Sequence, residues 1–477
     1  MKTFQSFSEI QSEIDSGKLT VSELIQYHLK QIEKNNGRLN AFLSVYGREA
    51  QKRAAEIDTK ISKGTAGRLA GLVVGIKDVF AYQDHPLSCA SQILEGFESQ
   101  YTATCIQRLL DEDAIIIGHQ NCDEFAMGSS NENSAFATAR NPIDEARVPG
   151  GSSGGSAVAV ASDMCQVSIG SDTGGSVRQP AAFCGVIGLK PTYSRISRYG
   201  LAAYASSFDT VGIISKSVED ASLVLEVMAG ADNFDSTVSH KEVPVYSTER
   251  MDKKYKVAYM RQTLEHDELN PEIKAATLQC IEKLKLDGHN VEAVDTTLMD
   301  YVLPTYYVLT AAEASSNLSR YDGVRYGKRS PSDSPESMYK RSRSDGFGAE
   351  VKRRILTGTF VLSASYYDAY YNKAQQVRRL IKDEIENILQ DYDFLISPTT
   401  PTTAFEIGAL NDDPIRMYLE DLYTVQANVA GIPAISIPYG FDNKGLPIGV
   451  QIMANSFNEQ KLLDISNQII TFKDQNS

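Results

Sequence analysis

The chain has 477 residues, 42% of them hydrophobic and 23% charged, which is an ordinary globular composition with ample length for a large core. Its formal net charge is −14, and an acidic surface that repels phosphate disfavours direct nucleic-acid binding as the main role. The six cysteines show no CxxC spacing, and the acidic N-terminal stretch has no apolar signal region. No apolar run approaches the ~20 residues that span a bilayer. These features predict a cytoplasmic protein that does not enter a membrane.

The first half of the chain predicts alternating helices and strands. Thr20 and Glu23 have the spacing of a capping box, so a helix is expected to begin there. Residues 72–76 form an apolar run that predicts a buried strand ending at Lys77. A helical stretch at 105–110 is followed by a second predicted strand at 114–118.

The second half continues the alternation without repeats or a low-complexity linker. It therefore predicts an α/β fold, a single large domain with a mixed central β-sheet covered by helices. The alternative is a split into two domains near residue 240, where the sequence is polar and irregular. The elements expected here are strands at 256–260, 394–396, 434–438 and 448–453, and helices at 272–286, at 365–389 and from Glu459 onward.

Two glycine–serine loops lie close together in the first half. Residues 150–155 read GGSSGG, a run that is unfavourable in a helix or a central strand because glycine loses so much conformational entropy there. Residues 172–176 read DTGGS and follow a short apolar strand predicted at 167–170. Ser176 is thus expected where the chain turns away from the end of the sheet, a usual place for ligand chemistry in open α/β sheets.

Several common explanations of such loops fail here. No GxxxxGK[ST] string or dinucleotide-binding fingerprint occurs, which argues against nucleotide binding. Residues 150–154 fit GxSxG, but the polar, turn-rich segment before them is not the strand that a nucleophile elbow requires. No histidine follows His289, so the late histidine of a Ser…Asp…His order is absent.

A serine enzyme without histidine needs another base, and lysine is the usual substitute. Lys77 ends an apolar strand, and burial there would lower the pKa of its amine enough for it to accept a proton. The plainer interpretation is a lysine at a strand end that extends its amine to solvent.

The run from Gly150 to Pro191 resembles the signature segment of the amidase signature family, as do GIKDVF around Lys77 and residues 431–453. The resemblance covers nearly the whole chain and implies one amidase domain over 1–477, with a signature core at about 70–215 and a polar insertion at about 319–350. It also implies a Lys–Ser–Ser triad in which Ser176 is the nucleophile, Ser152 the bridge after a cis peptide bond and Lys77 the base. The amides of Thr173, Gly174, Gly175 and Ser176 would then form the oxyanion hole.

Three further strings, at 124–136, 317–327 and 350–358, resemble the glutamine-hydrolysing subunits of tRNA-dependent amidotransferases within that family. This narrower resemblance implies that Arg354 holds the carboxylate of glutamine, Asp421 holds its ammonium and Tyr307 lines the pocket. The plainer interpretations are a surface-helix arginine, a carboxylate at a helix start and a core tyrosine.

The same resemblance implies a heterotrimer with the amidotransferase B and C subunits. The larger of these two partners would bind the tRNA, activate glutamyl-tRNA(Gln) with ATP and Mg²⁺ and receive the ammonia, and the small one would hold the two large chains together. This chain itself would need no cofactor. Two alternatives remain: a stand-alone amidase that hydrolyses small carboxamides, and a non-catalytic binding protein that kept the fold.

Overall fold

The computed structural model describes residues 3–246, 253–410 and 413–474. One mixed sheet of eleven strands runs through them in the order β1-β3-β2-β4-β6-β5-β10-β11-β9-β7-β8. Strands from both sides of residue 240 belong to this one sheet, as the predicted fold class requires. The strands are β1 Phe42–Val45, β2 Val73–Lys77, β3 Ile115–Gln120, β4 Val167–Asp172, β5 Ile187–Lys190, β6 Thr210–Ser215, β7 Lys256–Met260, β8 Asn290–Val294, β9 Phe394–Pro398, β10 Ala434–Phe441 and β11 Pro447–Ala454.

The sheet combines parallel pairs near its two edges with antiparallel pairs in the middle. β2 pairs in parallel with β3 and β4 near one edge, and β7 pairs in parallel with β8 and β9 near the other. The strands between them pair antiparallel, and β5 of the first half joins β10 of the second. The first and second halves of the chain are therefore joined by backbone hydrogen bonds.

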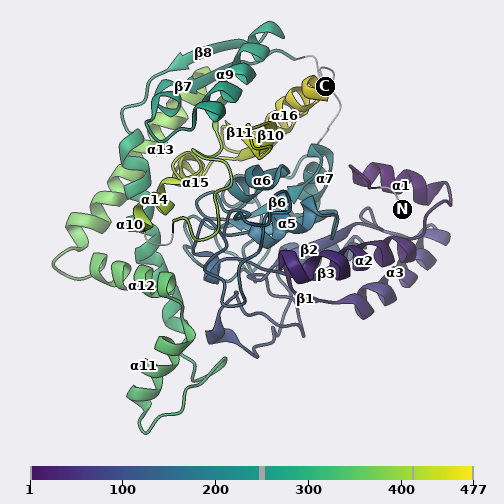
Figure 1. Cartoon of the computed structure of the whole chain (residues 1–477), viewed down its shortest axis with the longest axis horizontal. Helices are drawn as coiled ribbons and strands as arrows, with labels where there is room; N and C mark the ends of the chain where they lie inside the picture. The colour runs from purple at the N-terminus through teal and green to yellow at the C-terminus, as the bar shows by residue number, and fades with distance from the viewer. Residues whose placement is uncertain (1–2, 247–252, 411–412, 475–477) are drawn as a thin grey trace.

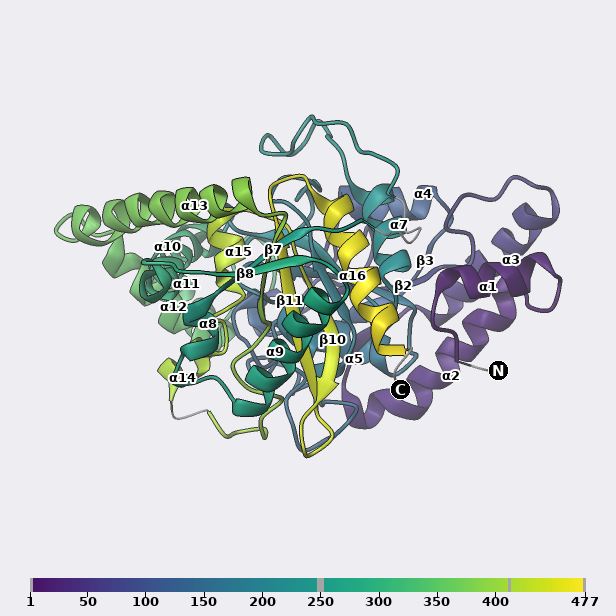
Figure 2. The ribbon, with the colours of Figure 1, turned by 90° about the horizontal axis from the view of Figure 1, so that it is seen from above.

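Helices cover the sheet and extend beyond its edges (Figures 1 and 2). The N-terminal helices lie beside the β1 edge, α5 and α6 lie near the middle, and α10 to α13 form a group at the opposite side from which α11 projects. The helices of eight or more residues are α1 Phe7–Asp15, α2 Val21–Leu39, α3 Gly47–Ser62, α4 Thr104–Asp111, α5 Gly154–Ala161, α7 Val218–Met228, α9 Pro271–Leu286, α10 Met299–Asn317, α11 Pro335–Gly346, α12 Ala349–Val361, α13 Lys373–Asp391 and α16 Glu459–Asp474. The shorter helices are α6 Arg178–Cys184, α8 Arg261–Glu265, α14 Pro414–Leu419, α15 Val425–Ala430, the 3-10 turns at 92–94, 124–126 and 318–320, and a π-helical turn at 367–372.

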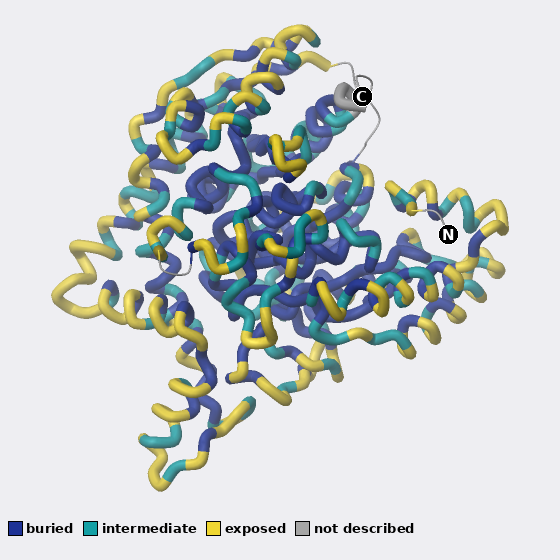
Figure 3. Tube along the Cα trace, viewed as in Figure 1, coloured by how far each residue is buried: buried dark blue, intermediate teal, exposed yellow. Residues whose placement is uncertain are grey.

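The core follows the sheet through the centre of the molecule (Figure 3). Every residue of β2, β4 and β6 is buried, so both faces of these strands are covered. Near-continuous apolar sequences such as VVGI in β2 are typical of strands covered in this way. Since Lys77 is the last residue of β2, the strand places its charged side chain inside the protein.

The structure confirms most of the predicted elements. The capping box at Thr20 and Glu23 is present, and β2 ends at Lys77. The helix predicted at 365–389 differs, because a π-helical turn at 367–372 precedes α13. The segment 319–350, predicted as a polar surface insertion, contains α11 and the first residues of α12.

The prediction that residues 150–155 contain no helix is wrong at their end. Gly154 and Gly155 form the first turn of α5. A Cβ atom on Gly155 would lie 2.5 Å from the carbonyl oxygens of Ala41 and Asn121. Close packing therefore selects glycine at this helix start, and the cost of fixing its backbone is offset by the contacts that its missing side chain permits.

Candidate functional site

The Lys77 amine lies among hydroxyl groups at the end of β2. Its Nζ atom is 2.7 Å from Ser152 Oγ and 2.9 Å from Ser171 Oγ, and hydrogen-bonds both. Ser171 comes from β4, the parallel neighbour of β2, so strand pairing brings it to the amine. Lys77 and Ser152 have no exposed surface, which rules out the solvent-exposed strand-end lysine.

Burial controls the charge of this amine. Desolvation lowers the pKa of Lys77 from 10.5 to about 8, although the nearby Cys122, Asp123 and Asp172 oppose the shift. The neutral amine is thus populated near physiological pH, where an exposed lysine would be almost fully protonated.

Ser176 lies beside the loop that carries Ser152. The backbone N–H of Ser153 donates to the carbonyl of Ser176 at 3.1 Å, and the Gly151–Ser152 peptide bond is cis, as the resemblance implied. Ser176 is 8% exposed, whereas Ser152 is fully buried. The Ser176 hydroxyl forms no hydrogen bond with any other described residue, so it remains available to a bound molecule.

The amides of the second glycine–serine loop divide into two groups. The Gly175 N–H donates to Asp172 Oδ1 at 2.9 Å, so it is already occupied. The N–H groups of Thr173, Gly174 and Ser176 donate to no acceptor within the described part of the chain. These three amides therefore have free N–H groups in the loop that carries the Ser176 hydroxyl.

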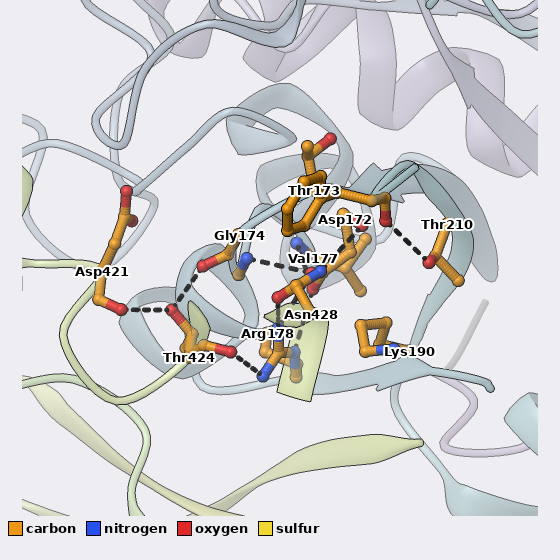
Figure 4. A network of polar contacts seen from close by, with 12 residues as sticks. Asp172, Thr173, Gly174, Val177, Arg178, Lys190, Thr210, Asp421, Thr424 and Asn428 are labelled. Atoms are coloured by element: carbon orange, nitrogen blue, oxygen red, sulfur yellow. Dashed lines mark hydrogen bonds and ion pairs between the residues drawn. The ribbon is translucent and has the colours of Figure 1, made fainter. Parts of the chain in front are cut away.

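A buried ion pair supports this loop from below (Figure 4). Arg178 donates from Nε to Asp172 Oδ2 at 3.0 Å and from Nη2 to Asp172 Oδ1 at 2.9 Å, and neither residue is exposed. Asn428 also hydrogen-bonds both residues. Burial by itself raises the pKa of Asp172, but the Arg178 guanidinium outweighs it and lowers the pKa to about 2. Asp172 is thus a fixed anion that holds the turn around Ser176.

Asp421 and Tyr307 lie together on the other side of the loop. Asp421 accepts hydrogen bonds from Tyr307 Oη at 2.7 Å and from Ser129 Oγ at 2.8 Å. Burial raises the pKa of Asp421 to about 6. Tyr307 comes from the middle of α10, and Asp421 lies in the turn between α14 and α15.

Arg354 lies next to the same tyrosine. Its guanidinium carbon is 5.4 Å from the centres of the Tyr204 and Tyr307 rings, and Nη1 donates to Tyr204 Oη at 2.6 Å. Arg354 is 5% exposed, so it is not a surface-helix arginine like its neighbour Arg353. The structure thus brings together a buried cation and a buried anion with Tyr307 between them.

Sequence reasoning missed several residues that support the site. Ser171, Asp172 and Arg178 lie inside the signature string, but nothing in their local pattern distinguishes them from ordinary strand and turn residues. Ser129 lies in the string at 124–136, and its contact with Asp421 joins residues 292 positions apart. Only the folded chain identifies such partners.

Residues 3–246, 253–410 and 413–474 contain neither a metal-binding cluster nor a membrane-spanning helix. No group of three or more His, Cys, Asp and Glu side chains is arranged to hold a metal ion there. No helix in these ranges has the length and apolar composition to cross a bilayer.

Known proteins resemble the chain over nearly its full length. The family model described as Amidase matches residues 23–463. The A subunit of glutamyl-tRNA(Gln) amidotransferase from Chlorobaculum tepidum is 50% identical over 475 residues, covering 98% of each chain, and the protein of that name from Nostoc sp. is 47% identical, covering 97% of this chain and 96% of its own.

Solved structures agree with these relatives. The crystal structure of the glutamyl-tRNA(Gln) amidotransferase A subunit from Thermotoga maritima superposes with a TM-score of 0.77 and 40% identity, covering 94% of this chain and 93% of its own. Peptide amidase from Stenotrophomonas maltophilia superposes with a TM-score of 0.82 and 28% identity, covering 97% of this chain and 96% of its own.

Proposed function

The chain belongs to the Amidase family, and we propose that it hydrolyses glutamine to glutamate and ammonia with Ser176 as nucleophile, Ser152 as bridge and Lys77 as base. One observation supports this most directly: a fully buried amine with a pKa lowered to about 8 hydrogen-bonds the Ser152 hydroxyl at 2.7 Å. At that pKa part of the amine is neutral at physiological pH, and a neutral amine can accept a proton from the hydroxyl that it contacts.

The first half-reaction begins at that amine. The Ser176 hydroxyl, which has no hydrogen-bond partner among the described residues, first turns toward Ser152. Neutral Lys77 then accepts the Ser152 proton while Ser152 accepts the proton of Ser176, and the Ser176 oxygen attacks the amide carbon of glutamine. The carbonyl oxygen becomes an oxyanion, which accepts hydrogen bonds from loop amides. The amides of Thr173, Gly174 and Ser176 are the best suited donors, because their N–H groups are free. The Gly175 amide, the fourth of the expected set, already donates to Asp172 and holds the loop.

Collapse of the tetrahedral intermediate breaks the carbon–nitrogen bond. Protonated Lys77 returns its proton through Ser152 to the departing nitrogen, which leaves as ammonia, and the acyl group stays on Ser176. A water molecule then attacks the ester, giving up its proton along the same route, and glutamate is released. Lys77, Ser152 and Ser176 end in their starting protonation states.

Glutamine is a zwitterion, so its recognition needs a cation and an anion at a fixed spacing. In this proposal Arg354 holds the α-carboxylate, Asp421 holds the α-ammonium, and Tyr307 lines the pocket. Ser129 orients the Asp421 carboxylate through its 2.8 Å hydrogen bond. The three predicted residues are mutually adjacent, and this supports the assignment.

The relatives are named as parts of an amidotransferase that acts on glutamyl-tRNA(Gln). We therefore propose that the ammonia converts Glu-tRNA(Gln) to Gln-tRNA(Gln) on a partner, the B subunit, which uses ATP and Mg²⁺ and contacts the tRNA, while the C subunit completes a heterotrimer. The net charge of −14 supports a tRNA site mainly on that partner. Six buried, unpaired cysteines support a reducing cytoplasm as the place of action.

The test compares wild-type protein with Ser176→Ala, alone and with both partners of the heterotrimer. Wild-type protein is expected to release ammonia from glutamine, and more with its partners. The variant should lose this activity by at least about a thousandfold while keeping its unfolding midpoint. Full activity in Ser176→Ala would overturn the mechanism. Rapid hydrolysis of acetamide by the isolated chain, with slow turnover of glutamine, would instead identify a stand-alone amidase.

A further inference from the structure

One carboxylate oxygen connects two side chains of the substrate pocket. Glu350 lies one helical turn before Arg354 on α12, and its Oε1 atom accepts from Arg354 Nε at 2.8 Å and from Tyr418 Oη at 3.2 Å. Its Oε2 atom pairs with the half-exposed Arg353. Burial opposes the ionisation of Glu350, but the Arg354 guanidinium lowers its pKa below the usual value, so the carboxylate stays charged at neutral pH.

The contacts continue from Tyr418 to the anion of the pocket. The Tyr418 ring stacks on Tyr307, with the ring centres 4.1 Å apart and the planes 29° apart. Tyr307 Oη in turn donates to Asp421 Oδ2 at 2.7 Å. A continuous path of contacts thus joins Arg354 to Asp421 through Glu350, Tyr418 and Tyr307.

The guanidinium of Arg354 is held on two sides and open on a third. Nε is held by Glu350, and Nη1 by the Tyr204 hydroxyl. Nη2 donates to no group among the described residues. A carboxylate that approaches Nη2 therefore meets a guanidinium whose rotation is already fixed.

We propose that Glu350 is a positioning residue that sets the spacing of the two charges that read the substrate. This inference rests on the proposed function and deepens it. Glu350 does not touch glutamine. It fixes the direction in which Arg354 presents Nη2, and through Tyr418 and Tyr307 it fixes the distance from that cation to Asp421. The pocket then selects amides that carry both an α-carboxylate and an α-ammonium.

The geometry separates a positioning role from a purely electrostatic one. Both Arg354 Nε and Tyr418 Oη donate to the same oxygen, so a neutral carbonyl oxygen at that place can accept the same two hydrogen bonds. Glu350→Gln provides this carbonyl and turns its amide NH₂ toward the outer Arg353. Glu350→Ala removes the acceptor and leaves the buried Arg354 Nε and the partly buried Tyr418 hydroxyl without this partner.

The experiment measures KM and kcat of wild type, Glu350→Ala, Glu350→Gln and the matched control Arg353→Ala in the assembled enzyme. The substrates are glutamine and 4-aminobutanamide, which keeps the amide and the ammonium but lacks the α-carboxylate. Glu350→Ala is expected to raise KM for glutamine by about tenfold or more, with kcat within about threefold. Glu350→Gln should restore KM to within about threefold, and Arg353→Ala should change it less than twofold. KM for 4-aminobutanamide should stay the same in all four proteins.

Three results would overturn the inference: an unchanged KM in Glu350→Ala, equal losses for both substrates, or a Glu350→Gln variant as poor as Glu350→Ala. Calorimetric titration with the product glutamate compares the binding affinities of the same variants without catalysis. If Glu350→Ala fails to fold, the titration compares Glu350→Gln with wild type. If wild type binds glutamate but does not hydrolyse glutamine, the proposed function is wrong while the titration still decides the role of Glu350. If wild type binds neither glutamate nor glutamine, the proposed function and the role of Glu350 are both wrong.

Discussion

Thr424 Oγ1 donates a hydrogen bond to the carbonyl of Gly174 at 2.6 Å, across 250 positions of sequence. Thr424 also reaches the carbonyl of Asp421 at 3.1 Å, so one hydroxyl contacts both the nucleophile loop and the turn that holds the substrate's ammonium in our proposal (Figure 4). In our proposal this contact fixes the distance between the reacting amide of glutamine and the residues that bind its other end.

Replacement of Thr424 by valine should therefore impair turnover more than folding. Valine keeps the shape but leaves the Gly174 carbonyl without its donor, which costs roughly 1–3 kcal/mol for a buried group. We expect kcat for glutamine to fall about tenfold or more, and Thr424→Ser to retain most of it. Steady-state kinetics of the two variants check this, and equal activity in Thr424→Val and wild type would contradict it.

The pH profile should report the Lys77 amine. Because the pKa of Lys77 is lowered to about 8, the amine is protonated and unable to accept a proton below that pH, and becomes neutral above it. The kcat/KM for glutamine should rise with pH through about 8 and then level off. Lys77→Arg should be inactive at every pH up to about 10, since a guanidinium does not lose its proton in this range. Activity in Lys77→Arg would exclude Lys77 as the base.

A second group should affect the acid side of the same profile. The pKa of Asp421 is raised to about 6 by burial, so Asp421 becomes neutral below that pH and loses its attraction for an ammonium group. KM for glutamine should therefore increase as pH falls through about 6. In Asp421→Asn, KM should be high at all pH values and no longer change there. A KM that increases equally in wild type and Asp421→Asn would assign this step to another group.

The buried Arg178–Asp172 pair should matter for stability. Arg178→Met leaves the Asp172 carboxylate buried without its cation, and removal of one partner of such a pair typically costs about 3–5 kcal/mol. The double variant Asp172→Asn with Arg178→Met should recover part of this loss, because no uncompensated charge remains. Urea denaturation of the three proteins measures the effect, and a double variant that is less stable than Arg178→Met would refute it.

Space beside the nucleophile should exclude a side chain at Gly174. A Cβ atom there would overlap the Tyr306 hydroxyl, so Gly174→Ala must displace Tyr306 or the loop. We expect a loss of glutamine turnover of about a hundredfold, since the loop amides are then misdirected. Gly37→Ala in helix α2 is the matched control, because its Cβ would meet nothing within 4 Å, and it should leave turnover unchanged.

The amino-acid sequence by itself was enough to identify candidate residues for a serine nucleophile and its base. A strand of apolar residues that ends in lysine must place that lysine at the end of a buried sheet, and two glycine–serine loops allow close approach of backbone at that edge. The resemblance of these strings to one family then implied the roles that we propose for Lys77, Ser152 and Ser176. Each of these inferences depends on residues adjacent in sequence, where chemical type and order contain the needed information.

How those residues are held depends on the folded chain. The pKa of Lys77 follows from its complete burial, and the Gly175 amide is taken by Asp172, a contact that no string predicts. Arg354 and Asp421 come from separate segments and meet only through Tyr307, Tyr418 and Glu350. Such contacts join side chains that are distant in sequence, and their geometry is set by how strands pair and helices pack, so they could not be read from local sequence.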